Sequence, residues 1–457
     1  MSEEATLDEY DDSVPTEGSE QSESRFWGTI PEGWELVDGT DVYDVNPNPK
    51  SDEEPNTYIE MDALDTELPW PRYFGERNAS EYSGKTFTAG DTLFARITPC
   101  TENGKAALVP EMDTKVGIGS TEYAVLSPKT ERIHPWYLYY LGKSYPVHNY
   151  AVSRMRGSTG RQRVPFSVFR RELDVAVPPL KEQRRVASVL YNIDHAIQKT
   201  EEVIDQSQRI IDGIIQEHIV DRISNAPSPT ALGEVPNNWE KVKLADVASE
   251  KEDSLVDGPF GSSLKSEEFI QNGFARIIQL QNVRKNEYSD SNIRYVDEPT
   301  FKELERHSAE PGDLIIAKMA SPVARACLLP DEYDHYMLGC ADVVKLEPGA
   351  GFIDKFVMYT LNSYPVWKQA AAHIRGSGRL RVNLNQLKEV SLPKPPLEEQ
   401  EKIVNAVEDF SDYIQSHEDE KERLKRIRQG LMQDLLSGTV RTTDTNIEVP
   451  EEIAQHG

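Results

Sequence analysis

The stretch PPLKEQRRVASVLYNIDHAIQKTEEVIDQSQRIIDGIIQEHI, residues 178–219, returns in outline 217 positions later as PPLEEQEKIVNAVEDFSDYIQSHEDEKERLKRIRQGLMQDLLS, residues 395–437. Each copy opens with Pro-Pro, which suits an extended entry followed by a first helical turn. Apolar residues then recur at alternating spacings of four and three, as on one face of a helix with a heptad seam. The sequence therefore predicts two long helices, over 178–222 and 395–438, with Gly438 as the C-terminal stop of the second.

The apolar seam predicts that the two helices pair with each other. It comprises Val186, Leu190, Ile193, Ile197, Ile204, Ile211 and Ile214 in the first helix and Ile403, Val407, Phe410, Ile414, Leu424, Leu431 and Leu435 in the second. Such a stripe cannot remain exposed to water, and a globular segment between the helices allows the chain to return. We expect an antiparallel intramolecular coiled coil; the alternative is a dimerisation coil between two chains.

A globular segment precedes each helix, so the chain reads as two tandem modules. The modules open on IPEGW at 30–34 and VPNNW at 235–239, and each has short strands separated by Gly, Pro and Asn turns. We expect an α+β fold in which two β-rich domains are separated by the two long helices. The predicted parts are a disordered acidic tail at 1–24, the first module at 25–177, the helix at 178–222, a linker at 223–234, the second module at 235–394, the helix at 395–438 and a tail at 439–457.

A basic Gly-Ser turn lies near the end of each module, RGSTGRQR at 156–163 and RGSGRLR at 375–381. Gly-Ser turns let backbone N–H groups approach phosphate, and Arg can form paired hydrogen bonds with phosphate or guanine. The turns therefore predict DNA contacts; the alternative is that these arginines pair with nearby acids and the glycines only shape a loop. The candidate residues are Arg154, Arg156, Gly157, Ser158, Thr159, Arg161 and Arg163 in the first module and Arg375, Gly376, Ser377, Arg379 and Arg381 in the second.

A further candidate in the second module is the loop DGPFGSSLK at 257–265, which contributes Ser262, Ser263 and Lys265. Its counterpart by position in the first module is expected near residues 58–64, where the sequence is different. Different loops in matching positions would suit two domains that recognise different sequences, although an ordinary surface turn would have the same composition.

The composition restricts the class of protein. The net charge is −28, and residues 1–24 hold nine acids and no Lys or Arg, which predicts a disordered segment. The dispersed acids elsewhere predict a halophilic protein, because at about 1 M salt the Debye length is only about 3 Å and repulsion from DNA is screened. The three cysteines, without a Cys-x-x-Cys pair, favour buried apolar positions over a disulfide or metal site. No apolar run or signal peptide is present, so a cytoplasmic location is expected.

Together, the PPLKEQ and PPLEEQ helix starts, the IPEGW and VPNNW openings, the DGPFGSSLK loop, and YIEMDALDTE (58–67) and ITPCTENGKAA (97–107) resemble the specificity subunit of type I restriction-modification systems. The resemblance covers roughly residues 26–440. It implies two target-recognition domains, each binding one half of a bipartite DNA sequence, with the coiled coil setting the spacer. It also implies association with two methylation and two restriction subunits. S-adenosylmethionine, ATP and Mg²⁺ would then act in those partners and not in this chain.

Two other readings are open on the sequence alone. A nuclease or methyltransferase in its own right has little support, because the chain has no Walker loop, no Asn-Pro-Pro-Tyr motif and no complete GxGxxG. No catalytic, cofactor or metal residue is therefore assigned. A coiled-coil scaffold that binds only proteins is the second alternative, in which the basic turns are purely structural.

Overall fold

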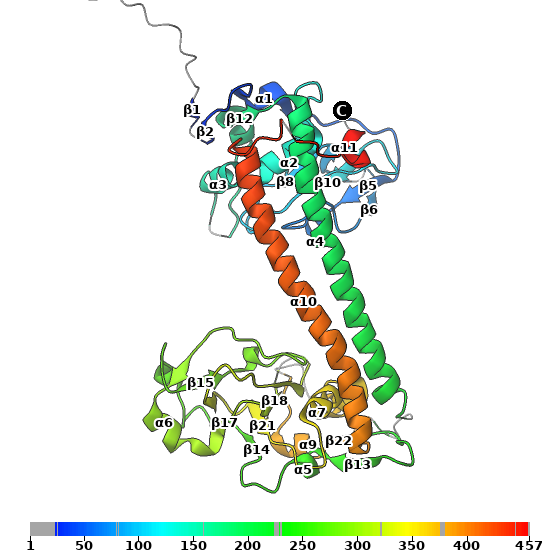
Figure 1. The fold of residues 1–457 in the computed structure, drawn as a ribbon, viewed down its shortest axis with the longest axis vertical. Helices are drawn as coiled ribbons and strands as arrows, with labels where there is room; N and C mark the ends of the chain where they lie inside the picture. The colour runs from blue at the N-terminus through cyan, green and yellow to red at the C-terminus, as the bar shows by residue number, and fades with distance from the viewer. Residues whose placement is uncertain are drawn as a thin grey trace, which may run out of the picture. The chain divides into compact units, whose positions relative to one another are not determined.

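The computed structural model describes residues 23–24, 26–78, 80, 82–158, 160–223, 228, 231–319, 322–374, 380–443 and 445–455. We predicted disorder for the acidic segment 1–24. Residues 1–22 lie outside the described residues, whereas Glu23 and Ser24 form a short strand paired with Gly28 and Thr29, so the prediction is wrong for these two residues. The chain divides into two compact units: residues 1–202 with 418–457 form the first unit, and residues 203–417 form the second. Each unit contains one module and one end of both long helices (Figure 1).

The first module contains two four-stranded sheets, in the orders β6-β5-β10-β7 and β4-β11-β8-β9, and a two-stranded ribbon in which β3 pairs with β12. All of its pairs are antiparallel except β5 with β10. Its strands, after the short pair β1 (Glu23–Ser24) and β2 (Gly28–Thr29), are β3 (Glu35–Asp38), β4 (Tyr43–Val45), β5 (Asn56–Ile59), β6 (Gly75–Arg77), β7 (Lys85–Phe87), β8 (Thr92–Ala95), β9 (Ala106–Leu108), β10 (Gly117–Gly119), β11 (Tyr123–Pro128) and β12 (Asp174–Val177). Its helices are α1 (Gly39–Val42), η1 (Met61–Ala63), α2 (Pro135–Lys143), α3 (Tyr145–Ser153) and η2 (Val168–Glu172).

The second module repeats this topology. Its sheets have the orders β16-β15-β20-β17 and β14-β21-β18-β19, with β15 parallel to β20, and β13 pairs with β22. The strands are β13 (Glu240–Lys243), β14 (Leu255–Asp257), β15 (Ala275–Ile278), β16 (Tyr295–Val296), β17 (Ser308–Ala309), β18 (Leu314–Ala317), β19 (Arg325–Leu328), β20 (Tyr336–Leu338), β21 (Val343–Leu346) and β22 (Ser391–Lys394). The helices are α5 (Leu244–Val247), η4 (Ser266–Glu268), η5 (Leu280–Asn282), α6 (Glu298–Glu303), η6 (Glu305–His307), α7 (Asp354–Leu361), α8 (Tyr364–Ala372) and α9 (Leu384–Lys388).

The short strands that we expected in each module are present. The turn before β8 and the turn before β18 each contain a Gly-Asp pair, and Gly90 and Gly312 both have a φ of +86°, which favours glycine. The segment Trp136–Leu141 of α2 and the matching segment Phe356–Leu361 of α7 are buried throughout, as expected for residues that cover one face of a sheet. Both segments therefore belong to the core.

One expectation about loop equivalence is wrong. In the shared topology, β5 corresponds to β15, so residues 58–64 correspond to the turn after β15, which contains η5. The loop 257–265 follows β14, whose counterpart is β4, so it corresponds to the segment that begins at Asn46. Matching the two loops by their position in the sequence gave the wrong pair, because the segment between β4 and β5 differs in length from the segment between β14 and β15.

The two long helices are α4 (Leu180–Ile215), continued by a π-helical turn η3 (Gln216–Val220), and α10 (Leu397–Leu436). In the first unit, Val186 and Leu190 of α4 lie in one core with Leu431 and Leu435 of α10. In the second unit, the other end of α4 and the start of α10 share a core, which includes Ile211, Ile214, Ile403, Val407 and Phe410. The helices are thus paired antiparallel within the chain. All fourteen seam side chains are buried or half-buried, and Gly438 has a φ of +71° directly after α10.

The three cysteines are free; Cys327 is buried, whereas Cys100 and Cys340 are half-buried, so the expected burial holds fully for only one of them. No helix within the described residues is long and apolar enough to cross a membrane.

The start of each long helix is held by an Arg–Glu–Trp cluster. In the first unit, Glu182 of α4 accepts hydrogen bonds from Trp34 Nε1 at 3.1 Å and from Arg441 Nε and Nη2 at 2.8 and 2.9 Å. The Arg441 guanidinium also lies 5.7 Å from the centre of the Trp34 ring. Since Arg441 follows α10, the end of one helix is fastened to the start of the other.

The second unit repeats this cluster with the helices exchanged. Glu399 of α10 pairs with Arg222, which follows α4, and accepts a hydrogen bond from Trp239 Nε1 at 2.9 Å. Arg222 lies 5.7 Å from the Trp239 ring. The two clusters differ in exposure, because the Glu182 side chain is 3% exposed and the Glu399 side chain is 24% exposed.

We expect Arg441→Met to lower the free energy of unfolding of the first unit by about 2–4 kcal/mol, because it leaves the buried Glu182 carboxylate without its cation. The matched change Arg222→Met, at the more exposed cluster, should lower the free energy of unfolding of the second unit by about 1 kcal/mol or less. Chemical denaturation of the full chain followed by fluorescence measures both. Equal effects of the two variants would contradict this account.

The same cluster predicts an acid transition. Although burial opposes it, the hydrogen bonds from Arg441 and Trp34 lower the pKa of Glu182. A carboxylate with a lowered folded-state pKa stabilises the fold above its unfolded pKa of about 4.3, and this contribution disappears as the pH falls through the folded value. The stability difference between the native chain and Glu182→Gln should therefore shrink below about pH 4. Thermal unfolding at a series of pH values tests this; a difference that does not change with pH would contradict it.

Candidate nucleic-acid interface

The basic turn of the first module is a closed loop. The backbone N–H groups of Arg156 and Arg163 donate to each other's carbonyl oxygens at 2.9 and 2.8 Å. Gly157 has a φ of +134°, and a Cβ there would lie 2.7 Å from the Arg161 carbonyl oxygen, so glycine is required. The N–H of Thr98 donates to the carbonyl of Gln162 at 3.0 Å, which fastens the turn to the loop after β8.

The Arg163 side chain forms an ion pair within the first module. Its guanidinium forms an ion pair with Glu122 at 2.8 Å, and Glu122 also receives Arg96 Nη1 at 3.3 Å. The hydrogen bond to Glu122 raises the pKa of Arg163. This arginine therefore holds the turn against the start of β11, as the structural alternative anticipated.

The second module has the same arrangement at Arg381. This residue pairs with Asp342, which occupies the place of Glu122 just before β21. Its neighbour Val382 donates its N–H to the Lys318 carbonyl, just as Val164 donates to the carbonyl of Arg96. The last arginine of each basic turn is thus a structural clamp.

Arg154 is also engaged within the module. Its guanidinium lies 4.8 Å from the centre of the Tyr150 ring and donates to the Tyr150 hydroxyl at 2.7 Å. It forms an ion pair with Glu172 at 3.4 Å. Although this side chain remains partly exposed, its orientation is set by these contacts.

Arg156 and Arg161 differ from these two arginines. Both are exposed, and neither forms an ion pair with any residue that the structure describes. Gly157, Ser158 and Gly160 are exposed as well. The tip of the turn therefore presents two exposed cations, without an ion pair to a described residue, beside accessible backbone, which suits a phosphate group.

Sequence reasoning missed a group of cations beside the turn. Lys85, Arg96 and Arg170 surround the Phe166 ring, with distances to its centre of 5.2, 4.1 and 5.7 Å. Burial, together with the neighbouring Arg96 and Arg170, lowers the pKa of Lys85. These residues come from three separate parts of the sequence, and no local pattern relates them.

The loops that carry the motifs YIEMDALDTE (58–67) and ITPCTENGKAA (97–107) are connected to the basic turn of the first module. Lys105 Nζ donates to the Met61 carbonyl at 3.1 Å and pairs with Asp62 at 3.2 Å, so the loop 97–105 is joined to η1. The same loop binds the basic turn through Thr98. The two motifs and the turn thus form one surface built from three loops.

The second module is described only in part at the matching turn. Arg375, Gly376, Ser377 and Arg379 lie outside the described residues, as does Thr159 of the first module. The loop after β14 is described, and Ser262, Ser263 and Lys265 are exposed on it, beside Phe260 with 68% of its surface exposed. Gly258 is required at the base of this loop, because a Cβ would lie 2.3 Å from the Cys340 carbonyl oxygen.

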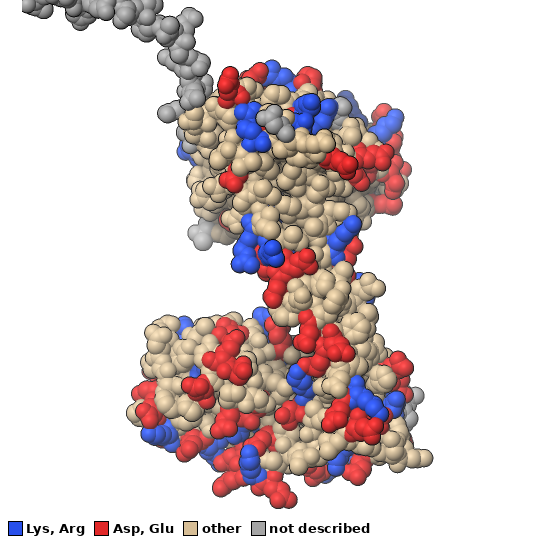
Figure 2. Space-filling view, in the orientation of Figure 1, with Lys and Arg blue, Asp and Glu red and all other residues tan. Residues whose placement is uncertain are grey.

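Acidic side chains are scattered over each unit on the face that Figure 2 shows, and basic side chains lie between them in small groups. A net charge of −28 makes general attraction to DNA weak, so binding must depend on local cations and direct contacts.

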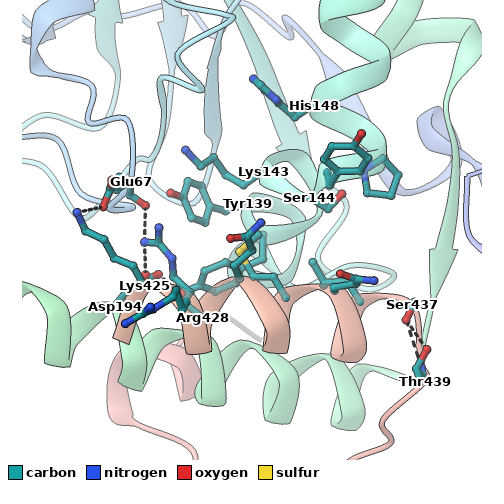
Figure 3. Close-up of a pocket in the computed structure, with 18 of the residues that line it drawn as sticks. Glu67, Tyr139, Lys143, Ser144, His148, Asp194, Lys425, Arg428, Ser437 and Thr439 are labelled. Carbon is teal, nitrogen blue, oxygen red and sulfur yellow. Dashed lines mark hydrogen bonds and ion pairs between the residues drawn. The ribbon is translucent and has the colours of Figure 1, made fainter. Parts of the chain in front are cut away.

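A pocket of about 930 Å³ lies in the first unit between α10 and the first module (Figure 3). Its charged groups are paired with each other: Arg428 with Asp194 at 3.0 Å, and Lys425 with Glu67 at 3.0 Å. Burial and the nearby Arg428 lower the pKa of Lys143 to about 8, and its ammonium group donates to the carbonyls of Thr66 and Gly104. Side chains that line the pocket thus connect α10 to Glu67, and α2 to the loop 97–105. Among the described residues no group of three or more His, Cys, Asp or Glu could hold a metal ion.

Residues 236–426 match the family described as the type I restriction modification DNA specificity domain. The chain is similar to the putative type I restriction enzyme MjaX specificity subunit of Methanocaldococcus jannaschii, with 24% identity over 91% of this chain and 95% of that protein. It is also similar to the EcoAI specificity subunit of Escherichia coli, with 28% identity over 63% of this chain and 45% of that protein.

The fold is similar to that of the S subunit of a type I restriction-modification system from M. genitalium, with a TM-score of 0.52, 15% identity, and coverage of 89% of this chain and 96% of that one. Residues 236–426 thus match the type I restriction modification DNA specificity domain, and the chain is similar over most of its length to a putative type I specificity subunit.

Proposed function

We propose that the chain recognises a DNA target in two parts, with each module binding one half-site and the paired helices setting the spacer between the halves. The observation that carries this proposal is the repeat itself: two modules of one topology present different loops at equivalent places. Two similar but non-identical readers suit two different half-sites.

In this proposal the loops that differ determine the DNA sequence that each module recognises. After β5 the first module has Glu60 and Met61, whereas after β15 the second module has Gln279 and Leu280. After β14 the second module has the exposed Ser262 and Ser263. Contacts from such side chains to base edges specify sequence, whereas contacts to phosphate position the protein.

The arginines of the first basic turn divide between two roles in this proposal. Arg156 and Arg161 bind phosphate, because both are exposed and neither forms an ion pair with a described residue. Arg163 and Arg381 position the turns through Glu122 and Asp342. By the similarity of the two turns, we assign Arg375 and Arg379 the phosphate role in the second module.

The chain acts in this proposal as the DNA-reading subunit of a complex with two methylation subunits and two restriction subunits. S-adenosylmethionine, ATP and Mg²⁺ belong to those partners. A cytoplasmic location and a halophilic source are part of the same proposal. The excess of acidic residues outside residues 1–24 supports the halophilic source.

We expect Arg161→Gln to reduce the slope of log K against log salt by about 0.9 for every DNA sequence, because one phosphate contact is lost. Assembly with the methylation subunits should be unchanged. Fluorescence anisotropy over a salt series measures the slope. The matched control is Arg132→Gln, an exposed arginine that pairs with Glu35 away from the turn. An unchanged slope for Arg161→Gln would favour the scaffold alternative.

Exchanging the second module, residues 235–394, for that of another specificity subunit should change one half of the modified sequence and leave the other half and the spacer intact. Sequencing of methylated bases in cells that carry the complex provides the measurement. A modified motif without a central gap, or a change in both halves, would contradict the two-part proposal.

A further inference from the structure

The described chain that follows the acidic N-terminal segment packs beside Tyr150, which holds Arg154, two residues before the basic turn. Residues 1–22 contain eight acids and neither Lys nor Arg. The chain after them is anchored by Trp27, which is buried and donates its Nε1–H to the Asp174 carbonyl at 2.9 Å. The neighbouring Phe26 packs edge-on against Tyr150, with 4.9 Å between the ring centres.

Tyr150 connects this entry point to the candidate interface. Its ring and hydroxyl hold Arg154, at 4.8 Å from the ring centre and 2.7 Å from the hydroxyl oxygen. Arg156 and Arg161 follow within seven residues of Arg154 and are exposed without an ion pair to any described residue. The chain that follows the acidic segment and the chain that leads into the basic turn therefore both contact Tyr150, through Phe26 and Arg154.

We propose that residues 1–22 bind the basic turn of the first module when DNA is absent and compete there with DNA phosphate. This inference rests on the proposed phosphate role of Arg156 and Arg161 and adds a regulatory segment to it. We assign this segment to the turn for two reasons. Its charge is opposite to that of the turn, and the chain that follows it packs against Tyr150, which holds Arg154.

Tethering makes this competition effective. Twenty-two residues reach up to about 70 Å when extended, so the segment can easily reach Arg161. Attachment to the same chain supplies an effective concentration in the millimolar range, which is enough to occupy a weak electrostatic site. The competition is expected at one module only, because the linker 223–234 that precedes the second module contains a single acid, Glu234.

The first test compares three chains: the full chain, a chain that lacks residues 1–22, and a full-length chain in which the eight acids of 1–22 are replaced by Asn or Gln. We expect the second and third to bind target DNA about 3- to 10-fold more tightly than the first, and we expect the difference to shrink as KCl rises, because screening weakens the tail's contact. All measurements use salt concentrations at which the three circular dichroism spectra agree. Equal affinity of the three chains at the lowest such concentration would overturn the inference.

The second test does not require DNA. A labelled synthetic peptide of residues 1–22 should bind the truncated chain, as measured by fluorescence anisotropy, and should bind the truncated Arg156→Gln/Arg161→Gln variant several-fold more weakly. A truncated Arg132→Gln variant is the control and should bind the peptide as the parent does. Equal binding to all three would overturn the inference. If none of the chains binds DNA but the peptide discriminates between them, the proposed function fails while the contact between segment and turn stands.

Discussion

The apolar stripe along each long helix is the constraint on which the rest of the structure depends. Neither stripe can face water, and each is covered by the other helix together with the module beside it. Because the helices pair antiparallel, the core of each unit needs the start of one helix and the end of the other. No unit can be completed from one copy of the repeat alone. The Arg441–Glu182–Trp34 cluster and its counterpart Arg222–Glu399–Trp239 fasten these exchanged ends in the same way in both units.

This scaffold separates what is shared between the modules from what differs. The shared parts are the sheet orders, the buried helices α2 and α7, and the clamps from Arg163 to Glu122 and from Arg381 to Asp342. The parts that differ are the turns between strands, which combine a few buried residues such as Leu64 and Leu264 with exposed ones such as Ser262. A loop held at its base by a glycine, as at Gly258, can change its outer residues without disturbing the strands. Recognition of different sequences can therefore change while the fold is kept.

Charge sets a second constraint. A chain with a net charge of −28 cannot rely on general attraction to DNA, so its few unpaired cations matter individually. Most arginines near the candidate interface are already bound to acids or aromatic rings, which leaves Arg156 and Arg161 as the exposed exceptions in the described part of that turn. The acidic segment that enters beside Tyr150 places an anionic competitor close to those two residues.

The sequence alone determined the features that depend on local periodicity. The heptad spacing from Val186 to Ile214 and from Ile403 to Leu435 predicted both long helices, and the alternation of apolar strands and Gly turns predicted β8, β18 and their neighbours. The repeated Pro-Pro starts also showed that there are two modules. These features depend only on residues that are close in the chain, so the local sequence is enough to predict them.

Only the tertiary structure decided which arginines are free and which loops correspond. Arg163 meets Glu122 across 41 positions and Arg441 meets Glu182 across 259, and no local pattern announces such partners. The cations around Phe166 come from three separate segments, and the loop after β14 was matched to the wrong loop because insertions shift the offset. A side chain is available to a ligand only if nothing else in the fold satisfies its charge, and long-range packing settles that question.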